Sequence, residues 1–191
     1  MSFDTAQTIL DAAESRIADY GYNKTTMADI ARDCHMSVGN LYRFFPNKSA
    51  IAAGMLSRNL ETKLKVGLQA ASRETMLFGR LQAFMIHRLR FAHQYFSSCR
   101  HLHECVSMIA AEHKNILEEA ERTIIETLAG MLKDGIEKKQ IRPVDPRRTA
   151  YLIHQACMRY NYPISLKNND LETLEADLRD TLKLFFEGLS C

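Results

Sequence analysis

Four residues near the N-terminus are of types and at a spacing that suit contacts with the edges of base pairs. They are Ser37, Gly39, Asn40 and Arg43. The helix that carries them is predicted by apolar residues that recur every three or four positions, namely Val38, Leu41, Tyr42 and Phe45. Asn can pair with the edge of adenine and Arg with the edge of guanine. A helix with this small, polar and basic face can enter the major groove of DNA.

A second short helix is predicted immediately before this one, so the two form a helix-turn-helix pattern. Its apolar face consists of Met27, Ile30, Ala31 and Cys34. Thr26 can cap this helix, Ser37 the next one, and Asn47 a third that opens with Lys48, because each side chain oxygen can accept a free amide of the first turn. The spacing alone also allows a helical hairpin buried in a larger α-domain.

The order of residues from Thr25 to Lys48 closely resembles the N-terminal domain of the TetR family of bacterial transcriptional regulators. The shared pattern is Thr-x-x-x-Ile-Ala, then Ser-x-Gly-x-Leu-Tyr-x-x-Phe, then a Lys that opens the next helix. The resemblance begins at Ile9-Leu10-Asp11-Ala12-Ala13 and passes through Gly21. Beyond Ala50 it rests on length, helical character and one later segment.

The motif and the resemblance together predict a surface that contacts double-stranded DNA. By resemblance, Thr26, Tyr42 and Lys48 are expected to face phosphates. The predicted DNA-binding residues are Lys24, Thr25, Thr26, Ser37, Val38, Gly39, Asn40, Tyr42, Arg43 and Lys48. The family usually has Gly in the turn where this chain has Cys34-His35. Since His tolerates a positive φ better than most residues, we expect the turn to survive with some strain.

The whole chain is predicted to be helical, so the expected fold class is all-α. We expect an N-terminal three-helix helix-turn-helix DNA-binding domain over residues 1–47, joined to a C-terminal helical ligand-binding and dimerisation domain over residues 48–191. Helices are predicted near residues 4–20, 48–71, 75–96, 98–112 and 114–139. Asp145 and Pro146 open a further helix, because Asp is a good N-cap and Pro suits the first helical position. Gly54 and Gly67 indicate close packing, with a soft rod between domains as the alternative.

The last two predicted helices have apolar stripes that suit the interface of a homodimer. A reader of an inverted-repeat operator needs a partner surface, and two helices from each subunit make a four-helix bundle. The predicted interface residues are Ile153, Cys157, Leu171, Leu174, Leu178, Leu182 and Phe185. The alternative is that both stripes pack inside one subunit.

The resemblance also implies a small-molecule effector, unknown in identity, held between helices of the C-terminal part. Ligand pockets are mostly apolar with a few polar groups. Residues of that kind, taken as the effector-binding set, are Phe84, His87, Phe91, Met108, His154, Met158 and Tyr162. Each of them suits a packed core as well.

The centre of the chain is rich in His and Cys, but no metal site and no cofactor are predicted. Cys99 and His103, like His101 and Cys105, are four residues apart. No CxxC, HxxxH or HExxH occurs, and a di-iron Glu-x-x-His pair is also missing. The motifs of an enzyme, such as a glycine-rich phosphate loop or a GxSxG turn, are absent too, so an enzyme is not expected.

Charge and composition restrict the way in which the chain could bind DNA. The formal net charge is +2, and residues 1–50 hold five Lys or Arg against six Asp or Glu. Contacts with phosphate would therefore rest on a few placed side chains rather than on bulk charge. The first residues lack a secretory signal, no apolar run suits a membrane span, and five scattered Cys suggest reduced thiols, so a cytoplasmic location is expected.

These observations predict a DNA-binding transcriptional regulator, in the form of a repressor that a small-molecule effector releases from a palindromic operator. One alternative keeps the DNA motif but makes a thiol or a metal the trigger. A second alternative is a helical enzyme or docking module in which the helix-turn-helix is incidental.

Overall fold

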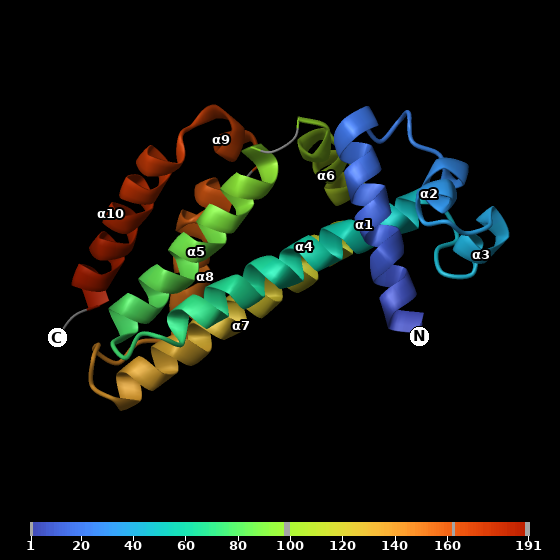
Figure 1. Ribbon diagram of the computed structural model, residues 1–191. Coiled ribbons are helices and arrows are strands. Elements are labelled where there is room, and N and C mark those ends of the chain that lie inside the picture. Colours follow the sequence, from blue (N-terminus) through green and yellow to red (C-terminus); the bar gives the residue numbers. More distant parts are fainter. Residues whose placement is uncertain (1, 98–99, 162, 190–191) are drawn as a thin grey trace. The chain divides into compact units, whose positions relative to one another are not determined.

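The computed structural model describes residues 2–97, 100–161 and 163–189, and these residues form helices with no strand among them (Figure 1). The all-α fold class is confirmed. The elements in chain order are α1 (Ser2–Tyr20), α2 (Met27–Asp33), α3 (Val38–Tyr42), α4 (Lys48–Ala71), α5 (Leu77–Ser97), α6 (Arg100–Glu112), α7 (Lys114–Glu137), α8 (Pro146–Ala156), the 3-10 helix η1 (Met158–Asn161), α9 (Pro163–Asn168) and α10 (Leu171–Leu189).

The chain divides into two compact units by its internal contacts. Unit 1 comprises residues 1–60 and 98–117, and unit 2 comprises residues 61–97 and 118–191. This division differs from the predicted boundary between residues 47 and 48, because the first part of α4 and the helix α6 both pack in unit 1 with α1. Sequence order alone did not indicate that α6 returns to the N-terminal part of the fold.

Unit 1 is built around the buried face of α1. Ile9, Ala13 and Ile17 have no exposed surface, as their spacing of four residues requires for one helix face. The first part of α4 crosses close to α1, since a Cβ at Gly54 would lie 3.1 Å from Leu10 Cδ2. This close approach supports packing as the reason for that glycine. Arg58 of α4 adds ion pairs to Asp11 and Glu14 of α1.

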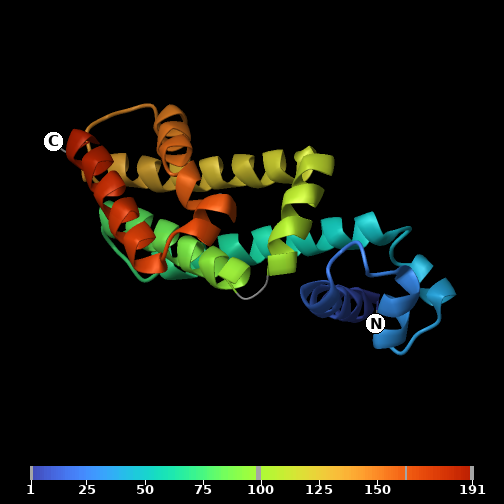
Figure 2. The same cartoon turned by 90° about the horizontal axis from the view of Figure 1, so that it is seen from above.

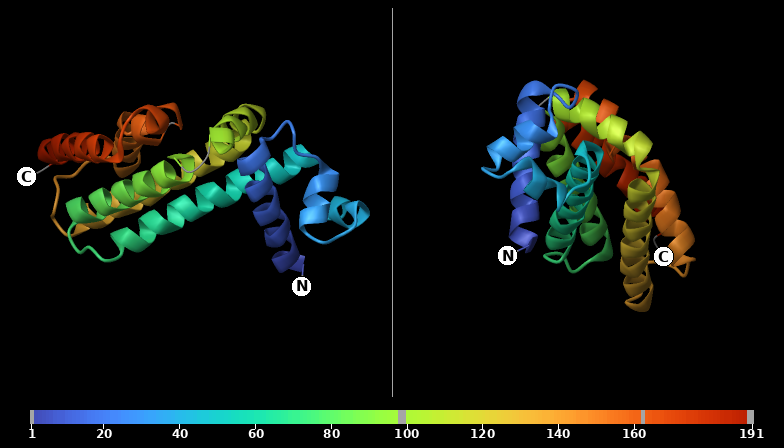
Figure 3. Two further views of the ribbon diagram at one scale, coloured as in Figure 1. Left: turned by 45° about the horizontal axis from the view of Figure 1, so that its top comes forward. Right: turned by 90° about the vertical axis from the view of Figure 1, so that its right-hand side faces the viewer.

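The core of unit 2 is centred on α5. Figure 2 shows α10 lying along α5, and Figure 3 shows the second half of α4 and most of α7 running beside α5. The guanidinium of Arg90 on α5 binds Glu175 of α10 through two hydrogen bonds of 2.5 and 2.7 Å. The N–H of Arg142 donates to the carbonyl of Leu189 at 3.0 Å, which fixes the end of α10.

Helix α8 begins as the sequence predicts. The side chain of Asp145 accepts hydrogen bonds of 2.9 and 3.0 Å from the amides of Arg147 and Arg148, and Pro146 occupies the first helical position. Such a cap contributes about 1 kcal/mol to stability. The cap orients α8 so that Ala150 and Ile153 are buried in the core of unit 2.

Among the helices that the structure describes, none combines the length and the apolar character that crossing a lipid bilayer would require.

Two glycines of α7 provide a matched test of packing in unit 2. A Cβ at Gly135 would lie 2.4 Å from Leu77 Cδ2, whereas a Cβ at Gly130 would meet nothing within 4 Å. We expect Gly135→Ala to lower the free energy of unfolding by about 1–3 kcal/mol, because the α5–α7 contact must open. Gly130→Ala should raise the free energy of unfolding by up to about 1 kcal/mol, because Ala has a higher helix propensity than Gly at an exposed position. Urea unfolding of both variants measures the difference, and a similar sign for both would contradict the packing.

Candidate nucleic-acid interface and ligand site

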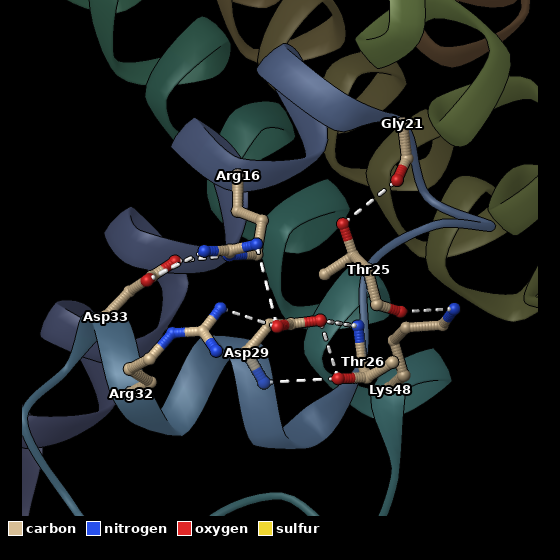
Figure 4. Close-up of polar contacts among 8 residues, drawn as sticks. All are labelled: Arg16, Gly21, Thr25, Thr26, Asp29, Arg32, Asp33 and Lys48. Atoms are coloured by element: carbon tan, nitrogen blue, oxygen red, sulfur yellow. Dashed lines mark hydrogen bonds and ion pairs between the residues drawn. The ribbon is translucent and has the colours of Figure 1, made fainter.

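The loop between α1 and α2 is fixed by hydrogen bonds among Gly21, Thr25 and Lys48 (Figure 4). Gly21 ends α1 with φ of +84°, a conformation that glycine adopts without strain. The hydroxyl of Thr25 donates to the carbonyl of Gly21 at 2.9 Å. The ammonium of Lys48 donates to the carbonyls of Tyr22 and Thr25, both at 2.8 Å, and lies 4.1 Å from the centre of the Tyr22 ring. The start of α4 therefore holds the loop that leads into α2.

Thr26 begins α2 with a complete capping box. Its Oγ1 accepts a hydrogen bond of 3.1 Å from the amide of Asp29, and the carboxylate of Asp29 accepts one of 3.1 Å from the amide of Thr26. The Thr26 hydroxyl also donates to that carboxylate at 2.7 Å. The predicted cap at Thr26 is confirmed, and the two reciprocal hydrogen bonds satisfy the free amides of Thr26 and Asp29.

Arg16 of α1 ties α2 in place through its two acidic residues. Its guanidinium donates to both carboxylate oxygens of Asp33, and its Nη1 lies 3.8 Å from Asp29 (Figure 4). The hydrogen bond from Arg16 lowers the pKa of Asp33, and hydrogen bonds from Thr26 lower the pKa of Asp29. Both carboxylates stay ionised at neutral pH, so this contribution to stability is present there and is lost only as the pH falls below the usual range of Asp.

The turn after α2 is a Schellman motif in which a histidine occupies the left-handed position. The amide of Met36 donates to the carbonyl of Ala31 at 2.9 Å, and that of His35 to the carbonyl of Arg32 at 3.0 Å. His35 has φ of +53°, a left-handed conformation that is energetically unfavourable for a residue with a Cβ. The prediction that His35 accepts this strained conformation is confirmed.

The helix α3 begins at Ser37, whose Oγ accepts the amide of Asn40 at 3.2 Å, so the predicted cap is confirmed. Leu41 is fully buried and anchors the helix. Within the described parts of the chain, the side chains of Asn40, Tyr42 and Arg43 have no internal hydrogen bond or ion pair. A Cβ at Gly39 would meet nothing within 4 Å. This face therefore has free polar groups and open space, which suits close approach of another molecule.

Two residues of the apolar pattern of α3 are more exposed than that pattern predicted. Val38 and Tyr42 were expected to pack inward with Leu41 and Phe45. Val38 is 37% exposed and Tyr42 is 51% exposed. The reason is that α3 has only five residues and rests on its neighbours mainly through Leu41. Both side chains consequently extend the exposed face of α3 with an apolar and an aromatic surface.

The predicted DNA-binding residues differ in how accessible they are. Thr25 is 1% exposed, and its amide and hydroxyl are both used inside the protein, so its side chain supports the loop rather than facing outward. The ammonium of Lys48 is likewise engaged by carbonyls. Lys24 and Thr26, by contrast, are exposed at the loop and at the start of α2.

The predicted effector-binding residues are spread over more than one part of the chain. Phe84 and His154 are buried in unit 2, and His87, Phe91 and Met158 are half-buried there. Met108 lies on α6, which belongs to unit 1, whereas the other described residues of the predicted effector-binding set belong to unit 2. Tyr162 lies outside the described residues. A surface hollow of about 360 Å³ between α7 and α8 is lined instead by residues such as Glu121, Glu126 and Tyr151.

Sequence reasoning missed two buried cationic residues next to Phe84 and His154. They are Lys63 of α4 and Arg88 of α5, which are 6% and 3% exposed. The signal was present, since Arg88 continues an apolar stripe of α5 formed by Leu81, Phe84, Met85, Leu89 and Ala92. A charged residue at a core position of a helix is the informative exception to the apolar pattern.

The described thiols are poor candidates for a redox trigger. Cys105 and Cys157 are buried, and burial raises the pKa of Cys105 to about 11 and that of Cys157 to about 12. Burial also raises the pKa of Cys34. A thiol with a raised pKa forms little thiolate and reacts slowly. Cys99, which the sequence suggested as a partner of His103, lies outside the described residues, and the rest of the described chain has no group of three or more His, Cys, Asp or Glu that could hold a metal ion.

Most of the residues predicted for the dimer interface are in the core of unit 2. Of these predicted interface residues, Ile153, Leu174 and Leu178 are at most 1% exposed. Cys157 and Leu182 are also buried in this core. Only Leu171 and Phe185 are partly exposed. The leucine stripe is therefore used within one chain, and this part of the prediction is corrected. The large apolar residues that α8 and α10 leave exposed are Tyr151, Leu152 and Leu184.

Comparisons with known protein families match both parts of the chain. The profile described as bacterial regulatory proteins, tetR family, matches residues 9–55. The profile described as tetracyclin repressor-like, C-terminal domain, matches residues 79–181, which is more than half of the chain.

Individual proteins of similar sequence or structure support this match. The HTH-type transcriptional regulator YhgD of Bacillus subtilis is 27% identical over 161 residues, which cover 80% of each chain. A TetR-family regulator from Mesorhizobium loti has a similar structure, with a TM-score of 0.79, 15% identity and coverage of 100% of this chain and 99% of that one. The regulator FadR from Bacillus subtilis, solved in complex with stearoyl-CoA, has a TM-score of 0.71, 18% identity and coverage of 96% and 98%.

The two lysines near the α1–α2 loop allow a direct test of what supports it. Lys48→Ala removes two hydrogen bonds to carbonyls and a cation–π contact. We expect it to lower the free energy of unfolding by about 1–3 kcal/mol, because hydrogen bonds from charged groups are among the stronger ones. Lys24→Ala, which removes an exposed lysine from the same loop, should change it little. Chemical unfolding gives both values, and equal stability of the two variants would show that the loop does not depend on Lys48.

Proposed function

The chain belongs to the TetR family of bacterial regulatory proteins and is a DNA-binding transcriptional regulator, and we propose that it recognises its operator through the exposed face of α3. One observation carries this proposal. The side chains of Asn40 and Arg43 have no partners among the described residues, and the helix between them and Ser37 includes a glycine in open space. A glycine inside a helix costs about 1 kcal/mol of stability relative to Ala. Close approach of a DNA backbone or base edge would explain why a residue without a side chain occupies this position.

We assign different tasks to the contact residues. Asn40 and Arg43 would read base edges in the major groove, since their side chains can form two hydrogen bonds to adenine and guanine. Thr26, Tyr42 and Lys24 would contact the sugar-phosphate backbone and fix the register of α3. Lys48 would act mainly through the loop that it holds. A regulator that acts on bacterial DNA would work in the cytoplasm.

Removal of the two base-reading side chains should reduce both affinity and selectivity. Asn40→Ala or Arg43→Ala should each cost about 1–3 kcal/mol of operator binding and should relax the preference at the base pair that the residue contacts. Fluorescence anisotropy with the operator and with single base-pair variants of it, at several salt concentrations, gives these values.

Two further substitutions separate base reading from charge. Lys24→Ala should weaken binding to all sequences alike and should reduce the salt slope by about one. Arg122→Ala removes an exposed arginine of unit 2 and should leave operator binding unchanged. Wild-type affinity and base preference in both the Asn40 and the Arg43 variants would refute the assignment of α3.

We also propose that the working unit is a homodimer that binds an inverted repeat. Two copies of α3 would have to be about 34–36 Å apart to enter successive major grooves. Support for the interface comes from Leu152 of α8, which is 42% exposed, and Leu184 of α10, which is 71% exposed. Large apolar side chains at this exposure suit contact with a second copy on the helices that the family resemblance assigns to dimerisation.

The proposed interface predicts a folded monomer from two exposed substitutions. Leu152→Glu combined with Leu184→Glu should convert the dimer to a monomer with an unchanged helical content and with strongly reduced operator affinity, because each half-site alone binds weakly. Sedimentation velocity, circular dichroism and a gel shift report the three properties. Leu178→Glu with Leu182→Glu would instead bury two charges in the core and unfold unit 2.

A matched control for this prediction is Leu117→Glu. Leu117 is an exposed leucine of α7, 38% exposed, that belongs to unit 1. It should leave the dimer intact. A wild-type protein that sediments as a monomer at micromolar concentration would exclude the proposed assembly.

Finally, we propose that the protein is a repressor whose operator binding is reduced by a small-molecule effector held in the helical core of unit 2. Support comes from the FadR structure of similar fold, which contains stearoyl-CoA, and from Phe84 and His154, which the sequence predicted for this role and which are buried in the same core. Effector and operator must then weaken the binding of each other by the same factor, because coupling between sites is reciprocal. The alternative of a thiol trigger is disfavoured by the raised pKa of each described cysteine.

A further inference from the structure

Three nitrogen-bearing side chains are buried in unit 2. Lys63 on α4 is 6% exposed, Arg88 on α5 is 3% exposed and His154 on α8 is 3% exposed. The only other buried polar side chain in the described residues is Thr25, which belongs to unit 1. No buried Asp or Glu therefore accompanies these groups in the parts of unit 2 that the structure describes.

The three side chains are neighbours. Arg88 lies directly against Gly67, since a Cβ there would be 2.7 Å from Arg88 Cγ. Lys63 is one helical turn before Gly67 and so is on the same face of α4. Burial lowers the pKa of both Lys63 and His154, and in each case the charge of Arg88 lowers it further. The electrostatic effect of Arg88 on both groups indicates that Lys63 and His154 lie near it.

The hydrogen-bonding capacity of this cluster is largely unused. The Nε of Arg88 and the Nδ1 of His154 are buried without a partner. The Nη1 of Arg88 reaches only the sulfur of Met85, at 3.6 Å. Among the residues described, Lys63 has no hydrogen bond and no ion pair. Buried donors of this kind normally have partners, so an acceptor is missing from the centre of the cluster.

Neither of the two nearby acidic groups supplies the missing charge. Glu121 lies 3.5 Å from His154 Nε2, but its Oε1 already accepts from Gln155 at 2.7 Å and its side chain is 38% exposed. The thiol of Cys157 interacts electrostatically with Arg88, but burial raises its pKa to about 12, so it is neutral. Burial also lowers the pKa of Arg88 to about 10, which shows how poorly its charge is compensated.

A buried cation without a counter-charge is strongly unfavourable, and a protein tolerates it where something else compensates. We propose that unit 2 binds an organic oxyanion whose acidic group is held by Arg88 and Lys63. This inference rests on the proposed function, because the anion would be the effector of the regulator.

The surroundings of the cluster define the rest of the ligand. The guanidinium carbon of Arg88 is 5.0 Å from the centre of the Phe84 ring, and Met85, Leu89 and Ile153 belong to the same buried core. A ligand that enters this core must have an apolar body behind its acidic head. The planar guanidinium matches the two oxygens of a carboxylate or of a phosphate, so the shared chemistry is an oxyanion on an apolar body.

Three probes with the same alkyl chain test this inference on the full-length protein. Decanoate and decyl phosphate have an acidic head, and decanol has a neutral one. We expect decanoate, decyl phosphate or both to raise the melting temperature of the wild type, and decanol to have a much smaller effect, because binding to the native state stabilises it. The comparison of decanoate with decyl phosphate distinguishes a carboxylate from a phosphate ligand.

Arg88→Met and Lys63→Met test the role of the two cations. Each replaces a buried basic group by an apolar chain of similar length, so the melting temperature without ligand should stay equal or rise, while the increase caused by the anions should be lost. The matched controls are Arg90→Met on α5 and Lys65→Met on α4, which remove exposed charges and should retain the increase. A merely structural role of Arg88 or Lys63 would instead lower the melting temperature without ligand.

Operator binding separates failure of this inference from failure of the proposed function. The Arg88 and Lys63 variants should bind operator like the wild type but should no longer be released by the anion. If the wild type binds operator and neither acidic probe stabilises it, or if decanol stabilises it as well as decanoate does, the oxyanion site is refuted. If the wild type shows no operator binding, the proposed function itself fails.

Discussion

The five-residue helix α3 cannot hold its shape alone in water, because helix nucleation is unfavourable and short helices gain too few hydrogen bonds. Its conformation therefore depends on the Schellman turn before it, on the cap at Ser37 and on the anchor Leu41. The conformation of that turn depends on the position of α2, and Arg16 of α1 fixes α2 through an ion pair with Asp33. The strained φ of His35 is maintained by the same arrangement. A few local hydrogen bonds and one buried leucine thus determine where the exposed polar face of α3 lies.

Local features of this N-terminal region could be predicted from the sequence because each depends on residues a few positions apart. The caps at Thr26 and Ser37 and the buried face of Ile30 and Ala31 are of this kind. Helical periodicity was less informative for Tyr42, since a helix of five residues does not bury a full stripe. Thr25 was included among the predicted DNA-binding residues, but it is 1% exposed, and Lys48, which is distant in sequence, binds its carbonyl.

In the C-terminal part, periodicity predicted which residues are buried but not what buries them. The stripe that includes Leu174, Leu178 and Leu182 is buried, yet by the core of its own unit and not by a second subunit. An apolar stripe has the same appearance in both cases, so only the exposures of Leu152 and Leu184 point to an outer surface. Lys63 and Arg88 were missed for the opposite reason, since charged residues are normally taken as solvent-facing.

The buried cations of unit 2 suggest why stability and regulation would be connected in this protein. An uncompensated charge in the core destabilises the unliganded state, so a ligand that supplies the opposite charge gains free energy that a fully paired core could not offer. Arg88 packs against α4 at Gly67, and Lys63 is on the same helix. The opening residue of that helix is Lys48, which holds the loop leading to α2. Helix α4 thus carries both a residue of the buried basic cluster and the residue that holds the loop leading to α2, so we propose that a ligand of the cluster acts on operator binding through this helix.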